Sequence, residues 1–342
     1  MNRLDGARVL VTGGAGFIGS HLVDALLRSG VAAVTVIDDL ATGHRENLDG
    51  ALTDARVRLI EADARDVDVL DDSMPGTDVV FHLACLGVRH SLHDPRENHE
   101  VNATLTLELL EHARRSGVGR FVHVSSSEVY GTALYAPMDE RHPTFPETVY
   151  GGAKLAGEAY ARAAFRTHGF PVTVVRPFNA YGPRSHFEGD SGEVLPRTIV
   201  RVLAGEAPLV YGDGEQSRDF THVTDTARGI LAITESDATI GRTINVGSGS
   251  DVTINDLAAI VLAVAGRHDL EPVHLEPRPG DVRRLLADSS LLHSLTGFTP
   301  TVSLQDGVAE LYGLLRDSGT DPAALLEQVE DRNWLRQAVR RG

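Results

Sequence analysis

Tyr150 and Lys154 are four residues apart in a segment with helical spacing, so both side chains would project from one face of a helix. A lysine ammonium beside a phenol stabilises the phenolate and lowers the tyrosine pKa from its usual value of about 10. Tyr150 could then accept a proton as a general base at neutral pH. Such a pair is also common on helix surfaces, but here Ser125, Ser126 and Ser127 end a strand-like run. Because ligands bind at the carboxyl ends of strands in open parallel sheets, the sequence predicts a proton-transfer site there.

A glycine-rich turn provides a second candidate site. Residues 13–19 read Gly-Gly-Ala-Gly-Phe-Ile-Gly, between a strand-like run and a helical pattern. Glycines at this spacing permit a tight turn and a close approach of backbone to a pyrophosphate, which the helix N-terminus attracts. Asp38 ends the next strand-like run, where an acidic residue binds a ribose 2′-hydroxyl. A carboxylate there repels a 2′-phosphate, so the sequence predicts NAD as the cofactor; His44 and Arg45 downstream leave NADP open as the alternative.

The composition sets the class of protein. The chain has 342 residues, of which 42% are hydrophobic and 23% charged, as expected for a globular protein of about two domains. Its formal net charge of −16 argues against a nucleic acid or an anionic membrane as partner. The single cysteine, Cys85, fits a reducing cytoplasm, and we expect it to be a small buried residue near the cofactor. No apolar signal-peptide stretch or run of 18 apolar residues occurs, so we expect a cytoplasmic protein that spans no membrane.

Strand-like runs alternate with helical patterns in the first half of the chain. The runs occupy 7–12, 34–37, 57–60, 78–83, 120–125 and 172–176, and the clearest helical patterns occupy 96–116 and 148–168. This alternation predicts parallel βαβ units. The expected fold class is therefore α/β, a doubly wound parallel Rossmann sheet with a smaller C-terminal α/β substrate domain.

The local composition changes after residue 180, where glycine, proline and charged residues become frequent. We expect an NAD-binding Rossmann domain over 1–180 with a returning segment at about 219–246. The second domain would comprise 181–218 and 247–318. A helical tail is expected over 319–342, because one helical face could be formed by Leu325, Leu326, Val329, Leu335 and Val339.

Several motifs occur together and in order. They are the glycine turn, His-Leu-Ala at 82–84, the serines before Val-Tyr-Gly at 129–131, the Tyr150 and Lys154 pair, Arg-Pro-Phe-Asn at 176–179, Tyr-Gly-Pro-Arg at 181–184, Gly-Asp-Gly-Glu-Gln-Ser-Arg-Asp-Phe at 212–220 and Asn-Val-Gly-Ser-Gly at 245–249. Over roughly 7–315 the chain resembles the extended short-chain dehydrogenase/reductase family, in its nucleotide-sugar 4-epimerase, dehydratase and decarboxylase group. The resemblance implies that the second domain binds a nucleotide-diphosphate sugar.

The resemblance also implies catalytic roles. Ser126 would hydrogen-bond the sugar O4, and Tyr150 would accept the O4 proton as a hydride leaves C4 for NAD. Lys154 would hold the nicotinamide ribose and tune Tyr150. Ser127 and Glu128 complete the expected catalytic set.

The binding residues follow from the same resemblance. NAD is expected to contact Gly13, Gly16, Phe17, Ile18, Gly19, Asp38, Ala62, Asp63, Leu83, Ala84, Asn102, Tyr150, Lys154 and Pro177. The substrate is expected to contact Arg89, Ser126, Tyr150, Asn179, Val194, Tyr211, Arg218 and Arg283. Arg218 and Arg283 carry the planar guanidinium forks that suit a diphosphate. Arg89, with His90 and His93, could approach a sugar carboxylate or hydroxyl, or could face solvent.

The sequence specifies the reaction less closely than it specifies the fold and the cofactor. All three subgroups first oxidise C4 to a ketone, so the shared residues do not separate them. The 4,6-dehydratases carry Asp-Glu where this chain has Ser127-Glu128, and the missing aspartate argues against dehydration. Glucuronate decarboxylases carry Thr-Ser-Glu-Val-Tyr, which is close to residues 126–130. We expect an NAD-dependent 4-epimerase acting on a UDP-hexose or UDP-hexuronic acid. The alternatives are a UDP-glucuronate decarboxylase or a nucleotide-sugar dehydratase of the same family and, more distantly, a non-catalytic NAD-binding sensor.

Two further expectations concern partners. The resemblance suggests a homodimer in which the segments 96–116 and 148–168 pair across a two-fold axis as a four-helix bundle. The histidines are scattered without ligand spacing, so no metal site is expected.

Overall fold

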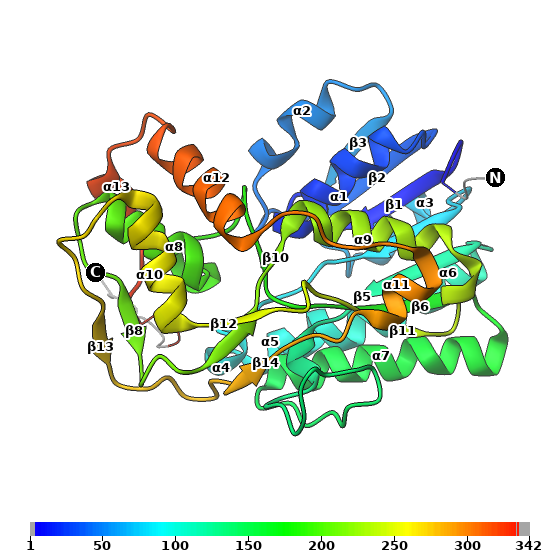
Figure 1. Cartoon of the computed structure of the whole chain (residues 1–342). Coiled ribbons are helices and arrows are strands. Elements are labelled where there is room, and N and C mark those ends of the chain that lie inside the picture. Colours follow the sequence, from blue (N-terminus) through cyan, green and yellow to red (C-terminus); the bar gives the residue numbers. More distant parts are fainter. Residues whose placement is uncertain (1–3, 333, 335–342) are drawn as a thin grey trace.

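The computed structural model describes residues 4–332 and 334 (Figure 1). Within this part of the chain, a seven-stranded parallel sheet has the order β11-β6-β5-β4-β1-β2-β3. Its strands are β1 Arg8–Thr12, β2 Ala33–Asp38, β3 Val57–Glu61, β4 Val79–His82, β5 Arg120–Val124, β6 Val172–Pro177 and β11 Thr243–Val246. The reversal of strand order between β1 and β4 defines a doubly wound Rossmann sheet, which confirms the predicted fold class.

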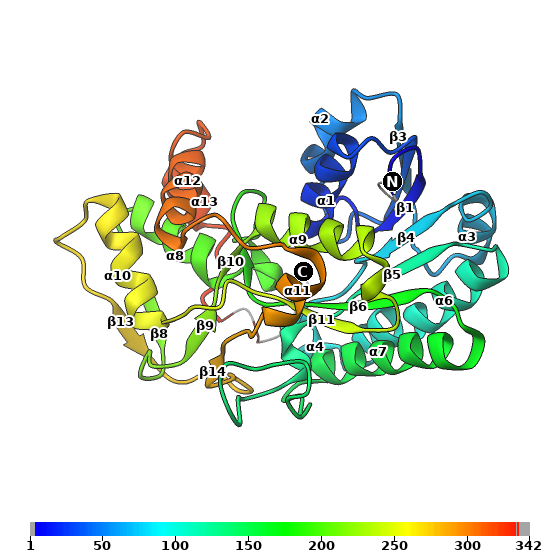
Figure 2. The same ribbon diagram turned by 45° about the vertical axis from the view of Figure 1, so that its right-hand side comes forward.

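The central strands are apolar on both faces because helices cover both sides of the sheet. Every residue of β4, β5 and β6 is buried, as parallel strands between two helical layers require. On one face, α1 Phe17–Arg28 and α9 Val223–Glu235 pack side by side (Figures 1 and 2). On the other face lie α3 Val67–Ser73, α6 Leu105–Arg115 and α7 Val149–His168. Shorter helices, α2 Asp49–Leu52, α4 His90–His93 and α11 Ser290–Thr296, border these layers.

Local signals explain the ends of α7, the helix that carries Tyr150 and Lys154. Thr148 caps its N-terminus, where the side-chain oxygen accepts a hydrogen bond from the backbone N–H of Gly151. Gly169 ends the helix in the left-handed conformation, with φ of 66°. The helix therefore begins and ends within one residue of the predicted segment 148–168.

The predicted helix over 96–116 is interrupted. It consists of α5 Pro95–His99, a π-helical turn over 100–104 and α6. At this turn the Asn102 side chain is fully buried and donates to the carbonyl oxygen of Leu86 at 2.9 Å. Single π-turns within a helix often mark functional sites, and this one fixes the segment that follows β4.

A second, smaller lobe packs beside the carboxyl edge of the sheet, at the left of Figure 1. Its core contains Leu195, Ile199, Leu257 and Val308. The strands and helices of this region are β7 Ala180–Tyr181, α8 Val194–Leu203, β8 Leu209–Tyr211, β9 Ser217–Asp219, β10 Thr221–His222, β12 Asp251–Thr253, α10 Ile254–Ala265, β13 Val273–Leu275, β14 Arg284–Leu285, α12 Leu304–Arg316 and α13 Pro322–Leu326. Short 3-10 turns lie at 45–48, 127–129, 189–191 and 237–239.

The C-terminal tail differs from the predicted continuous helix. Only α13 is helical among the described residues after 319, and it begins with Pro322 in its first turn. The chain then runs along α8, where Arg197 donates to the carbonyl oxygens of Glu330 and Asp331 at 2.7 and 3.2 Å. These hydrogen bonds hold residues 330 and 331 against α8 in a conformation that is not helical, whereas the apolar spacing predicted a helix there. Leu335 and Val339 lie outside the described residues.

Across residues 4–332 and 334, we found no helix with the length and apolar character needed to cross a membrane.

Candidate active site

A cavity of about 640 Å³ lies at the carboxyl ends of β1, β2, β4, β5 and β6, between the sheet and the smaller lobe. Its volume is typical of a site for a small molecule or cofactor. The predicted residues that line it are Gly13, Gly16, Phe17, Ile18, Gly19, Asp38, Ala62, Asp63, Leu83, Ala84, Arg89, Ser126, Ser127, Glu128, Tyr150, Lys154, Pro177, Asn179, Val194 and Arg218. The fold therefore brings most of the two predicted sites to a single opening.

The glycine turn forms one wall of the cavity because no side chain fits within it. Gly13 has φ of 71°, and a Cβ there would lie 2.6 Å from the backbone nitrogen of Ala84 at the end of β4. A Cβ on Gly19 would lie 2.1 Å from the carbonyl oxygen of Gly13. No side chain caps α1 at Gly16, so its first-turn N–H groups remain directed at the cavity. This arrangement fits the pyrophosphate of a dinucleotide.

Asp38 lies at the end of β2 beside this turn. Its carboxylate accepts hydrogen bonds from the backbone N–H groups of Ala15 at 2.8 Å and Leu40 at 2.9 Å. Burial raises the pKa of Asp38, and these two hydrogen bonds oppose that effect. Asp38 therefore holds the glycine turn in shape as well as facing the cavity. Asp63, farther along the same wall, is held by Arg65 at 2.6 Å.

Ser126, Tyr150 and Lys154 converge from β5 and α7. The Ser126 oxygen accepts from the Glu128 N–H at 3.2 Å, so its hydroxyl proton can be donated to Tyr150 or to a group bound in the cavity. The Lys154 ammonium is buried and donates to the Val124 carbonyl oxygen at 2.6 Å. This bond fixes Lys154 at the end of β5, one helical turn from Tyr150.

The protein alone shifts the pKa of Tyr150 in the direction opposite to the one expected. Burial raises this pKa, while a hydrogen bond with Ser126 acts to lower it. Burial also lowers the pKa of Lys154, which weakens the cationic effect expected from that side chain. A positive charge from a bound cofactor would lower the pKa of Tyr150 and so oppose the effect of burial.

Three charged groups surround the part of the cavity next to Ser126. Burial lowers the pKa of Arg89 to about 10, with Glu193 and Glu128 opposing the shift. Burial raises the pKa of Glu128, which Arg218 and Arg89 partly offset. Burial also raises the pKa of Glu193 to about 7. Two carboxyls of weakened acidity thus lie near one guanidinium, an arrangement suited to proton transfer or to binding of a polar sugar.

The smaller lobe contributes a cationic wall. Arg218 and Arg278 both line the cavity and share Asp281, with nitrogen–oxygen distances of 2.7 and 3.5 Å. Asn179 lies opposite; its Oδ1 is buried without a hydrogen-bond partner among the described residues. Paired guanidiniums and an unpaired amide are groups that a diphosphate and its nucleoside would satisfy.

Three predicted binding residues lie outside the cavity. Arg283 lies just before β14 and forms a surface ion pair with Asp213 at 2.8 Å. Asn102 holds the segment after β4 in place instead of lining the cavity. Tyr211 is covered by Trp334, and their rings meet edge to face at 5.0 Å.

Cys85 also differs from its prediction. It is exposed instead of buried, although it does line the cavity.

Sequence reasoning missed four features of this region. Arg278 takes the cavity position expected of Arg283, and Trp334 lines the cavity from the C-terminal segment. Glu193 also lines the cavity, and the local sequence around it does not predict this position. The fourth is a group formed by His44, His186 and Glu188, whose ligand atoms lie within 4.8 Å of one another. A His-x-Glu spacing at 186–188 was the only available signal for it.

These features define a dinucleotide-binding α/β enzyme fold with a tyrosine–lysine pair at the cofactor site. The profile of the NAD dependent epimerase/dehydratase family matches residues 9–247. The chain belongs to this family, and its cofactor is NAD.

Relatives within the family catalyse different reactions. The chain is 36% identical over 315 residues to UDP-glucose 4-epimerase of Mycolicibacterium smegmatis, covering 91% of this chain and 99% of the relative. It is also 36% identical over 319 residues to dTDP-glucose 4,6-dehydratase of Streptomyces niveus, covering 91% and 93%. Among solved structures, UDP-glucuronic acid 4-epimerase of Bacillus cereus in complex with UDP-glucuronic acid and NAD aligns with a TM-score of 0.84 at 32% identity, covering 91% and 99%. The chain is therefore similar to nucleotide-sugar enzymes, and identity alone does not select one reaction.

Proposed function

We propose that the protein is an NAD-dependent nucleotide-sugar 4-epimerase that acts on a UDP-hexose or UDP-hexuronic acid. The observation that carries this proposal is the content of the cavity beside Tyr150. It holds Ser126, Tyr150 and Lys154 for reversible oxidation at C4, and Ser127 where an acid that assists dehydration would be needed. Epimerisation requires the least additional chemistry, because the 4-keto sugar needs only to present its other face before reduction.

Each catalytic residue has a defined task in this proposal. When bound, NAD supplies a reversible hydride acceptor at C4 and a positive charge on its nicotinamide. Tyr150 accepts the proton of the sugar O4 hydroxyl and later returns it. The Ser126 hydroxyl donates to O4 and orients it. Lys154 is placed to hold the nicotinamide ribose and to stabilise the phenolate of Tyr150.

The cofactor and diphosphate would be held at opposite ends of the cavity. On the NAD side the proposal assigns Gly13, Gly16, Phe17, Ile18, Gly19, Asp38, Ala62, Asp63, Leu83, Ala84 and Pro177. On the substrate side it assigns Asn179, Val194 and Arg218, with Arg278 taking the place expected of Arg283. Both guanidiniums pair with Asp281. A diphosphate carries more negative charge than this one carboxylate, so it would compete with Asp281 for hydrogen bonds from both arginines.

Arg89 favours a hexuronic acid over a neutral hexose. Its guanidinium lines the cavity on the same side as Glu128 and Glu193, near the serines that face C4. A sugar carboxylate would satisfy this guanidinium with charge-assisted hydrogen bonds, each contributing about 1.5–3 kcal/mol. An arginine that stabilises the carboxylate also opposes its loss as carbon dioxide from a 4-keto intermediate.

One observation favours the decarboxylase as second candidate. Glu128 faces the same cavity, and burial raises its pKa, so a fraction remains protonated nearer neutral pH than for an ordinary glutamate. A protonated Glu128 could deliver a proton to C5 after carbon dioxide leaves. A purely NAD-binding sensor is disfavoured, because both Tyr150 and Lys154 are retained at the site.

Glu128→Gln separates the two candidates. For an epimerase, the carboxyl makes no obligatory proton transfer, so turnover should fall only modestly. For a decarboxylase, turnover should fall by the roughly 10²–10⁴-fold typical of a lost general acid. NMR of reactions with UDP-glucose and UDP-glucuronic acid measures the loss of turnover in the variant and identifies the product.

We also propose that the protein is a cytoplasmic homodimer formed through the segments 96–116 and 148–168. α6 and α7 pack against one another, and Leu107 on α6 and Val149 on α7 are each 43% exposed. These side chains are available to a second copy of the same surface, and a two-fold interface is the commonest way to cover one. Light scattering at micromolar concentration should give twice the chain mass of 36.7 kDa; a monomer mass would contradict the proposal.

A further inference from the structure

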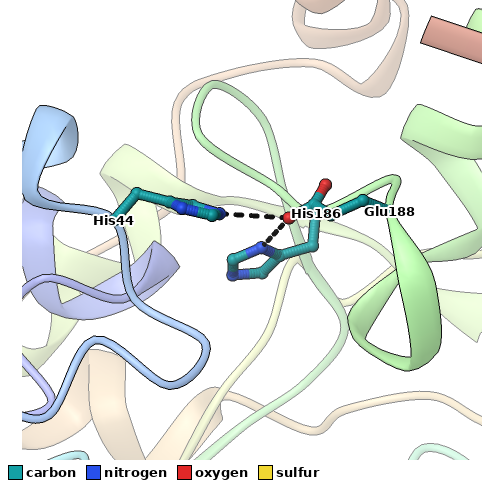
Figure 3. Close-up of side chains that lie close together, drawn as sticks. All are labelled: His44, His186 and Glu188. Carbon is teal, nitrogen blue, oxygen red and sulfur yellow. Dashed lines mark hydrogen bonds and ion pairs between the residues drawn. The ribbon is translucent and has the colours of Figure 1, made fainter. Parts of the chain in front are cut away.

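His44, His186 and Glu188 meet at the edge of the cavity, although 144 positions separate the first from the last (Figure 3). The Oε1 atom of Glu188 lies 3.1 Å from Nε2 of His44 and 2.7 Å from Nδ1 of His186. All three potential ligand atoms lie within 4.8 Å of one another. Figure 3 shows the two imidazole rings directed at the same carboxylate oxygen from two loops that are far apart in the sequence.

We propose that His44, His186 and Glu188 form a binding site for a divalent transition-metal ion, with zinc as the preferred occupant. Two imidazole nitrogens and one carboxylate oxygen make up a donor set typical of zinc, which leaves a fourth position for water. In a tetrahedral site with bonds of about 2.0–2.2 Å, neighbouring ligand atoms lie roughly 3.3 Å apart. The two nitrogen–oxygen distances are close to this spacing, and the two imidazole nitrogens, which lie within 4.8 Å of one another, would have to move closer together around an ion.

The backbone around the three residues holds them in position. The N–H of His44 donates to the carbonyl oxygen of Ala15 in the glycine turn, at 3.1 Å. The Phe187 N–H donates to the second oxygen of Glu188 at 2.8 Å, and the carbonyl oxygen of His186 accepts from the Glu193 N–H at 2.7 Å. Such surrounding hydrogen bonds orient metal ligands and raise affinity. The main chain at His44 and His186 and the Glu188 carboxylate are therefore held in place before a metal binds.

The chemistry of the ligand-free cluster also favours a cation. Each imidazole nitrogen that faces Glu188 must carry a proton in order to donate to it. Zinc would take the lone pairs of these two nitrogens once the proton of each neutral ring lies on its other nitrogen. Acidic groups on the same loop, Asp190 among them, add to the local attraction for a cation.

The location gives the ion a structural consequence. His44 follows β2 on the wall formed by Asp38 and the glycine turn, whereas His186 and Glu188 lie between β7 and α8. His186 lines the cavity. A bound ion would join the two walls at the cofactor end, so NAD should leave more slowly from the zinc-bound protein.

The proposal is tested by calorimetry. The untagged full-length protein is first treated with a chelator and then titrated with zinc. We expect one tight zinc site per chain. His186→Ala and Glu188→Gln each remove a direct ligand, so affinity should fall by more than the roughly 10–100-fold typical for loss of a surrounding hydrogen bond. His93→Ala is the matched control, because His93 contacts the same loop through Asp190 at 2.9 Å without belonging to the cluster; its zinc affinity should equal that of the unmodified protein.

Cobalt substitution gives a second readout that is independent of catalysis. Co²⁺ in the site should show the visible absorption of a tetrahedral ion, and this absorption should persist in Cys85→Ser, which excludes the exposed thiol as a ligand. Circular dichroism would verify that the variants are folded. Equal zinc affinity in the unmodified protein and in folded His186→Ala, or no zinc binding by either, would overturn the proposal and leave the cluster as a hydrogen-bonded contact. Neither result would bear on the proposed epimerase activity.

Discussion

Gly19→Ala tests whether the contact between the glycine turn and α1 sets the cofactor site. A Cβ at this position would lie 2.1 Å from the carbonyl oxygen of Gly13 and 2.8 Å from the Cα of Gly14. Both neighbours are backbone atoms, so no side chain can rotate away, and α1 must move from the turn. Overpacking of this kind costs about 1–3 kcal/mol in free energy of unfolding. For a chain of this length, Tm should fall by about 1–4 °C.

The same movement should weaken NAD binding. The N–H groups at the start of α1 are placed for a pyrophosphate, and each hydrogen bond to a charged group contributes about 1.5–3 kcal/mol. Loss of one such bond lowers affinity by about 10- to 150-fold. NAD affinity measured by calorimetry on cofactor-free protein provides the assay.

Gly313→Ala provides the matched control, because Gly313 lies inside α12 and a Cβ there meets no atom within 4 Å. Alanine in a helix interior should stabilise the protein by about 0.5–1 kcal/mol and leave NAD affinity unchanged. If Gly19→Ala bound NAD and unfolded like the unmodified protein, the steric account of the glycine turn would be refuted.

Three further predictions concern the catalytic side of the cavity and its support. Tyr150→Phe removes the proposed base and keeps the ring, so NAD affinity should be unchanged. Turnover measured by steady-state kinetics should fall by about 10²–10⁴-fold or more. Retained turnover would show that another residue is the base. Burial raises the pKa of Glu193 from 4.5 to about 7, so its stabilising contribution is fully present below 4.5 and is lost as pH rises through about 7. Between these two pKa values Tm should decline more in the unmodified protein than in Glu193→Gln, and the difference should level off at higher pH; parallel pH profiles would count against it. Arg176 donates to both carboxylate oxygens of buried Glu158, at 2.8 and 2.6 Å. Glu158→Gln breaks this ion pair and should lower the free energy of unfolding by about 3–5 kcal/mol, measured by thermal unfolding. An unchanged Tm would show that the pair does not stabilise the fold.

The parts of the site that lie on regular elements could be predicted from the sequence. The glycine turn and Asp38 follow short apolar strands, and Tyr150 and Lys154 lie one turn apart on a capped helix. In each case the spacing alone determines which side chains share an edge or a face. That is why these residues are found around one cavity.

The residues on long loops could not be placed in this way. Arg278 lines the cavity, whereas Arg283 forms an ion pair with Asp213 at the surface. Nothing in the local pattern distinguishes these two arginines. The burial of Glu193 and the meeting of His44 with His186 depend on how the two lobes pack, which is a property of the assembled fold.

The central claim is that the 4-keto intermediate is reduced on its opposite face without loss of any carbon or oxygen. Incubation with UDP-glucuronic acid and, separately, with UDP-glucose, followed by NMR of the sugar and a carbon dioxide assay, tests this claim directly. The account predicts a C4 epimer from at least one of these sugars, faster from the hexuronic acid, with no carbon dioxide released. A pentose product with stoichiometric carbon dioxide, or a 4-keto-6-deoxy sugar, would contradict it.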